Sequence, residues 1–322
     1  MRVGVVDCGT NTVRLLIADG PAGASDISSP GLTDVVRVLR FVRLGQGVDA
    51  THRFHPDALA RTFAALDEYA GIIAANGPLD ALRFLATSAA RDATNREEFF
   101  AGVQARLGVT PDVISGDEEA RLSFVGALTD QSTPSGPVLV LDIGGGSTEL
   151  IAGNYRGYQG QVSLAHSYDM GSVRLRERFL AGDPPTADEI TAARGFVTAL
   201  LDDGPLPLPW VLAEFDDGAF IGVAGTNTTL SALHMGLTSY DANRVNNSQL
   251  APSEIHALAE QLLATPVATL QARYPILEPL RAEVICAGAL ICDEIARRVG
   301  RPMIVRETDI LDGAAIDLLR QG

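Results

Sequence analysis

Hydrophobic and polar positions along this 322-residue chain alternate between a strand-like and a helix-like period. Short apolar runs bounded by glycine, proline and polar clusters predict strands, and longer stretches with apolar residues three or four apart predict helices. Because the two kinds of element are interleaved, the pattern predicts an α/β protein. The predicted strands lie near 2–7, 13–18, 35–43, 82–87, 111–115, 138–142, 148–153, 162–169, 219–224 and 302–305. The predicted helices lie near 56–75, 95–107, 117–128, 172–180, 187–202, 227–236, 253–264, 279–299 and 310–320.

One predicted strand ends in a stretch with almost no side chains. In VLVLDIGGGSTELIAG, residues 138–153, the apolar run stops at Asp142, three glycines follow, and the apolar pattern resumes at Leu150. Glycine lets the backbone adopt positive φ and approach a ligand closely, and consecutive N–H groups can form a cradle for an anion. For a single copy, a plain tight turn explains the pattern equally well.

The same device occurs a second time, at the N-terminus. VGVVDCGTNTVRLLIA, residues 3–18, also runs from strand through an aspartate and a polar, glycine-containing turn back to strand. Both segments return to strand and not to helix, so they are β-hairpins and not Walker-type phosphate loops. Two hairpins in register, each led by an aspartate, favour ligand binding over a plain turn. Matching positions are Asp7 and Asp142, Gly9 and Gly144, Thr12 and Ser147, and Leu15 and Leu150.

A cluster of acids precedes the second hairpin. VISGDEEARLSF, residues 113–124, is predicted to end a strand and begin a helix on three successive acids, the last of which is Glu119. Acids in a first helical turn commonly do no more than stabilise the helix dipole and its free N–H groups. Because this segment leads into the second hairpin, one of these glutamates could also face Asp142 and Glu149.

Two further segments carry groups suited to anions. FLATSAARDATN, residues 84–95, presents Arg91, which either pairs with a neighbouring acid or holds phosphate oxygens through two parallel hydrogen bonds. FIGVAGTNTTLSALHMGL, residues 220–237, places Gly225 and Thr226 at the start of a predicted helix. That helix start is either an anion site or simply a capped helix end.

Composition limits the function classes. A formal net charge of −15 argues against nonspecific binding to nucleic acid or to an anionic membrane, since both need a broad basic surface. No apolar run is long enough to span a bilayer, and no cleavable export pattern is visible at the N-terminus. The three cysteines form no CxxC pair, which fits a reducing compartment, so a cytoplasmic location is expected.

Taken together, these motifs resemble the exopolyphosphatase and guanosine pentaphosphate phosphatase family (Ppx/GppA), within the actin, hexokinase and Hsp70 superfamily. This resemblance implies two actin-like, ribonuclease H-like lobes with the active site in a cleft between them. The first lobe would comprise residues 1–124, completed by 306–322, and the second residues 125–305. The segments that carry the resemblance are DCGTNTVRLLI, VRLGQGV, ATSAARDATN, ISGDEEARL, LDIGGGSTEL, GVAGT and DILDGAAIDLL.

Site residues follow from the resemblance one by one. Glu119 resembles the family's catalytic base, and Arg91 matches an arginine expected near phosphate. Asp142 and Glu149 resemble the acids associated with Mg²⁺, or with Mn²⁺ in its place. Arg14 stands where the second hairpin has Glu149, so the first hairpin should not bind metal in the same manner. The expected phosphate-binding residues are Thr10, Asn11, Gly144, Gly145, Gly146, Ser147, Gly225 and Thr226.

The resemblance implies an exopolyphosphatase, which hydrolyses the terminal phosphoanhydride bond of inorganic polyphosphate and releases orthophosphate. An alternative within the family is removal of the 5′-terminal phosphate of guanosine pentaphosphate. Alternatives of other classes are a noncatalytic sensor of alarmone or polyphosphate and an ATP-dependent sugar kinase or chaperone ATPase. The resemblance also implies self-association as a homodimer. Many family members carry an arginine where this chain has Asp312.

Overall fold

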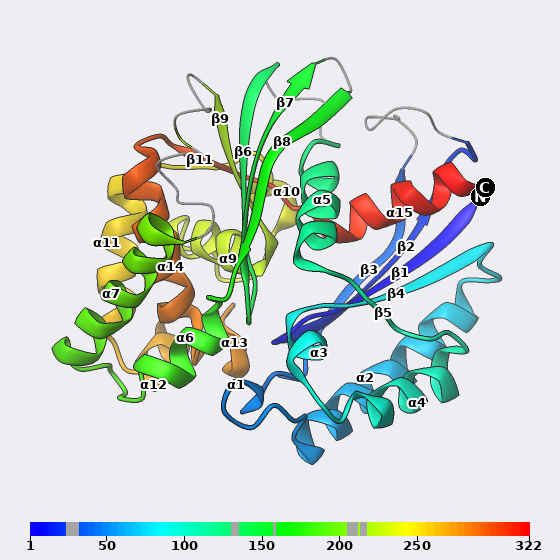
Figure 1. The fold of residues 1–322 in the computed structure, drawn as a ribbon, viewed down its shortest axis with the longest axis horizontal. Helices are drawn as coiled ribbons and strands as arrows, with labels where there is room; N and C mark the ends of the chain where they lie inside the picture. The colour runs from blue at the N-terminus through cyan, green and yellow to red at the C-terminus, as the bar shows by residue number, and fades with distance from the viewer. Residues whose placement is uncertain (24–31, 130–134, 157–158, 205–211, 213–217) are drawn as a thin grey trace. The chain divides into compact units, whose positions relative to one another are not determined.

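The chain forms two compact α/β units, which Figure 1 shows with their elements labelled. The computed structural model describes residues 1–23, 32–129, 135–156, 159–204, 212 and 218–322. The units are Met1–Gln131 with Gly157–Gly160 and Thr308–Gly322 (unit 1), and Ser132–Arg156 with Gln161–Glu307 (unit 2). The boundary predicted between residues 124 and 125 falls inside helix α5 (Gly116–Ala127), which belongs as a whole to unit 1.

Unit 1 is built on a sheet of order β3-β2-β1-β4-β5 among its described residues. β1, β4 and β5 run parallel, while β2 lies antiparallel to both β1 and β3. The strands are β1 (Arg2–Cys8), β2 (Thr12–Asp19), β3 (Thr33–Phe41), β4 (Ala81–Ala86) and β5 (Asp112–Val113). The helices, besides α5, are α1 (Val48–Thr51), α2 (Pro56–Ala75), α3 (Ser88–Asp92), α4 (Arg96–Leu107) and α15 (Ile310–Gln321).

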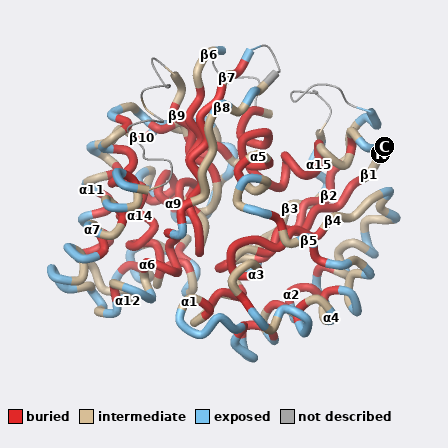
Figure 2. Tube along the Cα trace, in the orientation of Figure 1, coloured by how far each residue is buried: buried red, intermediate tan, exposed pale blue. Residues whose placement is uncertain are grey.

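Helices cover both faces of this sheet, and the alternation of side chains along β1 explains why (Figure 1). Val6 and Cys8 point to one face, where they join a core that includes Leu66 of α2. Val3 and Val5 point to the other face and join a core with Leu311 of α15. Strands that are buried on both faces read as continuous apolar runs, as β1 does. Figure 2 shows these strands buried and the outward turns of α2 and α4 exposed.

Helices α5 and α15 approach each other so closely that glycine is required at the contact. A Cβ on Gly126 would lie 1.7 Å from the carbonyl oxygen of Asp309. A Cβ on Gly313 would lie 2.1 Å from the carbonyl oxygen of Leu122. The C-terminal helix is therefore seated directly on α5, which ties the end of the chain to unit 1.

Unit 2 contains a sheet of order β10-β11-β9-β6-β7-β8 among its described residues. β6, β9 and β11 run parallel, and β7 is antiparallel to β6. The strands are β6 (Gly136–Ile143), β7 (Thr148–Arg156), β8 (Gln159–Tyr168), β9 (Ala219–Val223), β10 (Gln249–Leu250) and β11 (Met303–Val305). The helices are α6 (Ser172–Phe179), α7 (Ala187–Asp203), α9 (Ala224–His234), α10 (Ala242–Val245), α11 (Pro252–Leu263), α12 (Val267–Arg273), α13 (Pro279–Ala282) and α14 (Ile285–Val299).

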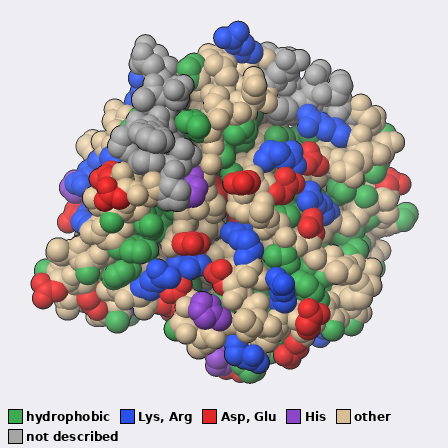
Figure 3. Space-filling view, in the orientation of Figure 1, with side chains coloured by type: hydrophobic (Ala, Val, Ile, Leu, Met, Phe, Trp, Pro, Cys, Tyr) green, Lys and Arg blue, Asp and Glu red, His purple; other side chains and the backbone are tan. Residues whose placement is uncertain are grey.

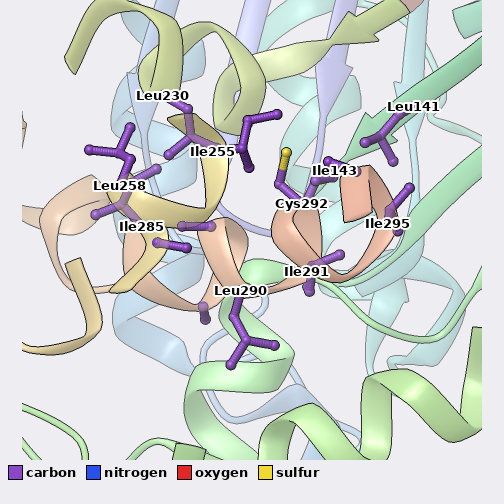
Figure 4. Close-up of a cluster of buried hydrophobic side chains, with 14 of the residues drawn as sticks. Leu141, Ile143, Leu230, Ile255, Leu258, Ile285, Leu290, Ile291, Cys292 and Ile295 are labelled. Atoms are coloured by element: carbon purple, nitrogen blue, oxygen red, sulfur yellow. The ribbon is translucent and has the colours of Figure 1, made fainter. Parts of the chain in front are cut away.

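The core of unit 2 forms around α14, which is buried along most of its length. In Figure 4, Ile291, Cys292 and Ile295 of α14 lie near Leu141 and Ile143 of β6. These two β6 side chains alternate with Asp142, which therefore points to the opposite face of the sheet. The strand thus buries one face in the core and presents its acid on the other.

The elements predicted from the sequence are present, but one predicted helix is divided and several short elements were not predicted. The predicted helix 279–299 is two helices, α13 and α14, separated at residues 283–284. Its apolar period continues through the break without glycine or proline, so the sequence gives no signal for it. No predicted counterpart exists for helices α1, α3, α10 and α12 or for strand β10. The predicted α/β class is confirmed. None of the helices within the described residues combines the length and apolarity needed to cross a membrane.

The α5–α15 contact yields a stability test at Gly313. Substitution Gly313→Ala should lower the free energy of unfolding by about 1–3 kcal/mol, because the new methyl group forces two backbones apart. Gly71→Ala is the matched control, since Gly71 lies exposed in α2 and a methyl group added there would meet open space. That change should leave stability unchanged or raise it by about 0.5–1 kcal/mol. Urea unfolding followed by circular dichroism measures both, and equal midpoints would contradict the packing argument.

Candidate functional site

In unit 1, the candidate residues follow the carboxyl ends of parallel strands. β1, β4 and β5 run in the same direction, so the segments after Cys8, Ala86 and Val113 gather at one edge of the sheet. In open α/β sheets this edge is where ligands bind. The turn of the first hairpin, helix α3 with Arg91 and the first turn of α5 with Glu119 all begin there.

Arg91 and Glu119 form a direct ion pair. Nη1 of Arg91 donates to Oε2 of Glu119 at 2.7 Å and to the carbonyl oxygen of Ile114 at 3.0 Å. The side chains are 24% and 12% exposed, so the pair is largely shielded but still reachable from solvent. The ion pair fixes the direction of the Glu119 carboxylate. A carboxylate that acts as a general base needs such a fixed direction toward the proton that it removes.

The neighbouring acids of α5 behave differently. Ser115 caps the helix by accepting a hydrogen bond from the N–H of Glu118 at 3.2 Å. The Glu118 carboxylate binds Arg121, three residues further along, through Nε at 2.8 Å. Glu118 therefore has the helix-stabilising role that is common for such acids. Glu119 instead reaches across to an arginine of another helix.

The turn of the first hairpin buries polar atoms that are not satisfied. Thr10 and Asn11 are 6% and 5% exposed. Within the described residues, neither Oδ1 nor Nδ2 of Asn11 has a hydrogen-bond partner. The carbonyl oxygen of Asn11, in contrast, accepts from the N–H groups of Val42 and Arg43 at 3.0 and 2.9 Å. Buried polar atoms without partners are uncommon and often mark a ligand site, so this turn is consistent with the predicted contact to phosphate.

In the first hairpin, an arginine lies opposite the leading aspartate. Asp7 and Arg14 are direct cross-strand partners. Nη2 of Arg14 donates to Oδ2 of Asp7 at 2.6 Å, and Arg14 also binds Asp309 at the start of α15. Burial raises the pKa of Asp7, and the Arg14 guanidinium opposes that shift. The acid of this hairpin is thus neutralised within the protein.

Asp312 extends this ion-pair network. Its Oδ1 accepts from Nη2 of Arg37 at 2.6 Å, and its Oδ2 accepts from the N–H of Asp309 at 2.8 Å. Burial raises the pKa of Asp312 to about 6, although Arg37 acts in the opposite direction. The residue that stands in place of an expected arginine therefore caps α15 and ties it to β3.

In the second hairpin, two acids oppose each other at the same register position. Asp142 and Glu149 are cross-strand partners, and they are only 6% and 1% exposed. Oε1 of Glu149 accepts from Oγ of Ser167 at 2.6 Å. Like charges directly opposite each other in a sheet destabilise it, and burial increases that cost. The pair therefore suits a cation that takes oxygen ligands, and the residues fit the predicted Mg²⁺ or Mn²⁺.

Helix α6 holds the glycine loop, which we define as residues 144–147. Its first N–H groups donate to loop carbonyls: Ser172 to Gly144 at 2.9 Å, and Val173 to Gly145 at 2.8 Å. Nε of Arg174 donates to the carbonyl of Gly146 at 2.8 Å. In a trans peptide the N–H points opposite to the C=O. The next three N–H groups, those of Gly145, Gly146 and Ser147, therefore point away from α6 and can converge on an anion.

Gly225 and Thr226 lie beside this loop within unit 2. They lie in the first turn of α9, which directly follows β9, the parallel neighbour of β6. Oγ1 of Thr226 donates to the carbonyl of Ile143 at 3.0 Å, so this hydroxyl binds the strand that leads into the loop. A Cβ on Gly225 would lie 2.2 Å from Nη2 of Arg281. The helix start is therefore joined to the loop strand and lies against a buried arginine.

The predicted residues divide between the two units, and each unit brings its own members together. The unit 1 set consists of Thr10, Asn11, Arg91 and Glu119. The unit 2 set consists of Asp142, Gly144, Gly145, Gly146, Ser147, Glu149, Gly225 and Thr226.

Three contributors in unit 2 are not predicted by the sequence patterns. Ser167 orients Glu149, Arg174 holds the glycine loop and Arg281 lies against Gly225. A glycine followed by serine at the start of the helix that carries Arg174 was an available signal. Ser167 and Arg281 had none, because their roles depend on contacts between segments distant in the sequence.

A second cluster of charged side chains in unit 2 has a structural role. Potential ligand atoms of His256, Glu260 and Asp293 lie within 4.8 Å of one another. Among the described residues, this grouping has the composition and spacing that could hold a metal ion. However, Nη1 of Arg194 donates to Asp293 at 2.9 Å, and Nη2 of the same side chain binds Glu260. An arginine already supplies the positive charge, so the cluster joins α7, α11 and α14 through ion pairs.

Comparison with known proteins places the chain among phosphatases. The model of the Ppx/GppA phosphatase family matches residues 23–308. Exopolyphosphatase 2 of Mycobacterium tuberculosis is 42% identical over 327 residues, covering 98% of each chain. A solved structure described as an exopolyphosphatase-like protein is 40% identical, with a TM-score of 0.89 over 100% of this chain and 99% of its own. The Ppx/GppA family member of Aquifex aeolicus is 29% identical, with a TM-score of 0.78 over 100% and 98% of the two chains.

Removing the charge at the position that faces the aspartate should change the stability of the protein in opposite directions for the two hairpins. In metal-free protein at pH 8, Glu149→Gln should raise the free energy of unfolding by roughly 0.2–1 kcal/mol, because it relieves a like-charge pair. Arg14→Gln should lower it by about 3–5 kcal/mol, because it leaves a buried acid without its partner. Urea unfolding in the presence of a chelator measures both. A loss of stability in Glu149→Gln similar to that in Arg14→Gln would refute the assignment.

Proposed function

The chain belongs to the Ppx/GppA phosphatase family, and from this premise we propose that it is an exopolyphosphatase. It hydrolyses the terminal phosphoanhydride bond of inorganic polyphosphate and releases orthophosphate. A relative named Exopolyphosphatase 2, matched over 98% of both chains, supports this substrate. The observation that carries the proposal is the glycine loop, whose carbonyls are held by α6 so that its N–H groups point away from that helix.

In this proposal, backbone and side-chain donors bind the phosphate oxygens of the substrate. The glycine loop provides N–H donors, and the turn of the first hairpin provides Thr10 and the Asn11 side chain. Such contacts neutralise and orient a crowded group of oxygens, which is most of what catalysis of phosphoryl transfer requires. Thr226 supports the loop through its hydrogen bond to the carbonyl of Ile143.

Asp142 and Glu149 would hold Mg²⁺, or Mn²⁺ in its place, with Ser167 orienting Glu149. When bound, the ion supplies positive charge to the phosphate oxygens. Glu119 acts as the general base that orients and deprotonates the attacking water, and Arg91 holds its carboxylate in place.

The net charge of −15 does not oppose a polyanionic substrate. Salt confines the reach of exposed charges to roughly 10 Å, so the groups nearest the substrate dominate. On the face drawn in Figure 3, arginines and acids are interspersed over the described residues, so neither sign forms a broad field there.

Guanosine pentaphosphate is the alternative substrate, since its 5′ end carries the same kind of terminal phosphoanhydride and the proposed contacts are made to phosphate. Phosphate release measured in parallel from long polyphosphate, short polyphosphate, guanosine pentaphosphate and ATP, with and without Mg²⁺, separates the alternatives. Tight binding without phosphate release would indicate a sensor, and sugar-dependent formation of ADP would indicate a kinase. A homodimer and a cytoplasmic location stay predictions.

The base assignment is tested by Glu119→Gln. This variant should bind polyphosphate as the wild type does and lose roughly 10²–10⁴-fold in turnover, because the amide cannot accept the proton of the attacking water. The matched control is Glu118→Gln in the same helical turn, whose carboxylate binds Arg121. It should keep turnover within about threefold of wild type. Near-normal turnover in Glu119→Gln would exclude Glu119 as the base.

A further inference from the structure

Arg174 stands apart from the other arginines of α6. Its side chain is buried, with 9% of the residue exposed. Arg176 and Arg178 contact other parts of unit 2: Nη1 of Arg176 donates to the carbonyl of Gly182, and Arg178 lies over the ring of Phe196. Arg174 turns toward the glycine loop instead. Its backbone N–H donates to the carbonyl of Gly145 at 3.1 Å, and its Nε donates to the carbonyl of Gly146 at 2.8 Å.

The side chain of Arg174 reaches a carbonyl beyond those that the helix backbone holds. The N–H groups of α6 that bind the loop donate to the carbonyls of Gly144 and Gly145. The third carbonyl, that of Gly146, accepts from the Arg174 side chain. Helix and loop are in tight contact here, since a Cβ on Gly171 would lie 2.4 Å from the carbonyl carbon of Gly145. The last peptide of the loop is thus oriented by a guanidinium.

Orientation matters because glycine peptides rotate easily. A glycine populates positive and negative φ with similar ease, so the peptide between Gly146 and Ser147 is not fixed by its own sterics. If this peptide turned over, its N–H would leave the cradle and its carbonyl oxygen would face the phosphate. One donor would be replaced by one repulsive dipole. Arg174 also keeps a positive charge close behind the loop, where little water screens it.

From these contacts we infer that Arg174 is a positioning residue that holds the Ser147 N–H toward a bound phosphoryl group. The inference rests on the proposed function, since the ligand is the terminal phosphoryl group of polyphosphate or the orthophosphate released from it. Arg174 acts through the loop and affects substrate and product alike. Its loss therefore weakens phosphate affinity and leaves the chemical step little changed.

The test compares Arg174→Met with Arg176→Met. Both remove a guanidinium from α6 and leave an unbranched side chain, but only the first one touches the glycine loop. For polyphosphate hydrolysis, Arg174→Met should raise KM and the inhibition constant of orthophosphate together by roughly 10–100-fold, as expected for a lost hydrogen bond to a charged group. Its kcat should stay within about threefold of wild type, and Arg176→Met should leave all three constants close to wild type.

A third variant separates orientation from charge. Arg174→Lys keeps the positive charge but lacks the Nε donor, so its KM should stay raised as in Arg174→Met. Full recovery of KM in the lysine variant would overturn the inference, because charge alone would then suffice. Equal KM values in Arg174→Met and Arg176→Met would overturn it as well. If Arg174→Met does not fold, the lysine variant decides the question.

Calorimetry with inorganic phosphate keeps this inference separate from the proposed function. If the wild type releases no phosphate from polyphosphate, the proposed function fails. Loss of phosphate binding in Arg174→Met, with binding retained in wild type and Arg176→Met, would still support Arg174. Equal phosphate binding by all three proteins would refute the inference while leaving the proposed function intact.

Discussion

The residue that faces the leading aspartate determines the role of each hairpin. The two hairpins share one register, with Asp7 opposite Arg14 and Asp142 opposite Glu149. In the first, an arginine neutralises the acid and links it to Asp309, so the hairpin is tied into its own unit. In the second, two buried acids face each other, an arrangement that is destabilising and that a bound cation would relieve. A single cross-strand position thus separates a structural ion pair from a candidate metal site.

In each unit, a helix packs near the hairpin, and glycines allow the close backbone contacts that this packing requires. α15 approaches α5 at Gly126 and Gly313, and its first residues bind the arginines of β2 and β3. α6 approaches the glycine loop at Gly171, and its donors hold the loop carbonyls. Because a backbone amide and its carbonyl point in opposite directions, fixing the carbonyls on one side also fixes the donors on the other. The direction of the loop N–H groups therefore depends on helix α6, which holds the loop carbonyls.

Much of this arrangement could be predicted from local sequence. The two hairpins follow from their shared pattern of aspartate, glycine and apolar strand, and the strands and helices follow from periodicity. What could not be predicted depends on distant contacts. The pairing of Arg91 with Glu119 needs two strands to end at the same edge, and the sequence left open whether Arg91 binds an acid or phosphate. The separation of α13 from α14 has no local signal, and neither has Ser167, which reaches Glu149 from a neighbouring strand.

The most direct measurement of the central claim is Mn²⁺ binding to the substrate-free protein, comparing wild type with Glu149→Arg by calorimetry. This substitution gives the second hairpin the charge pattern of the first, with an arginine opposite an aspartate. The account predicts that wild type binds Mn²⁺ and that the variant folds but does not bind it. A folded variant that binds Mn²⁺ with wild-type affinity would contradict the account.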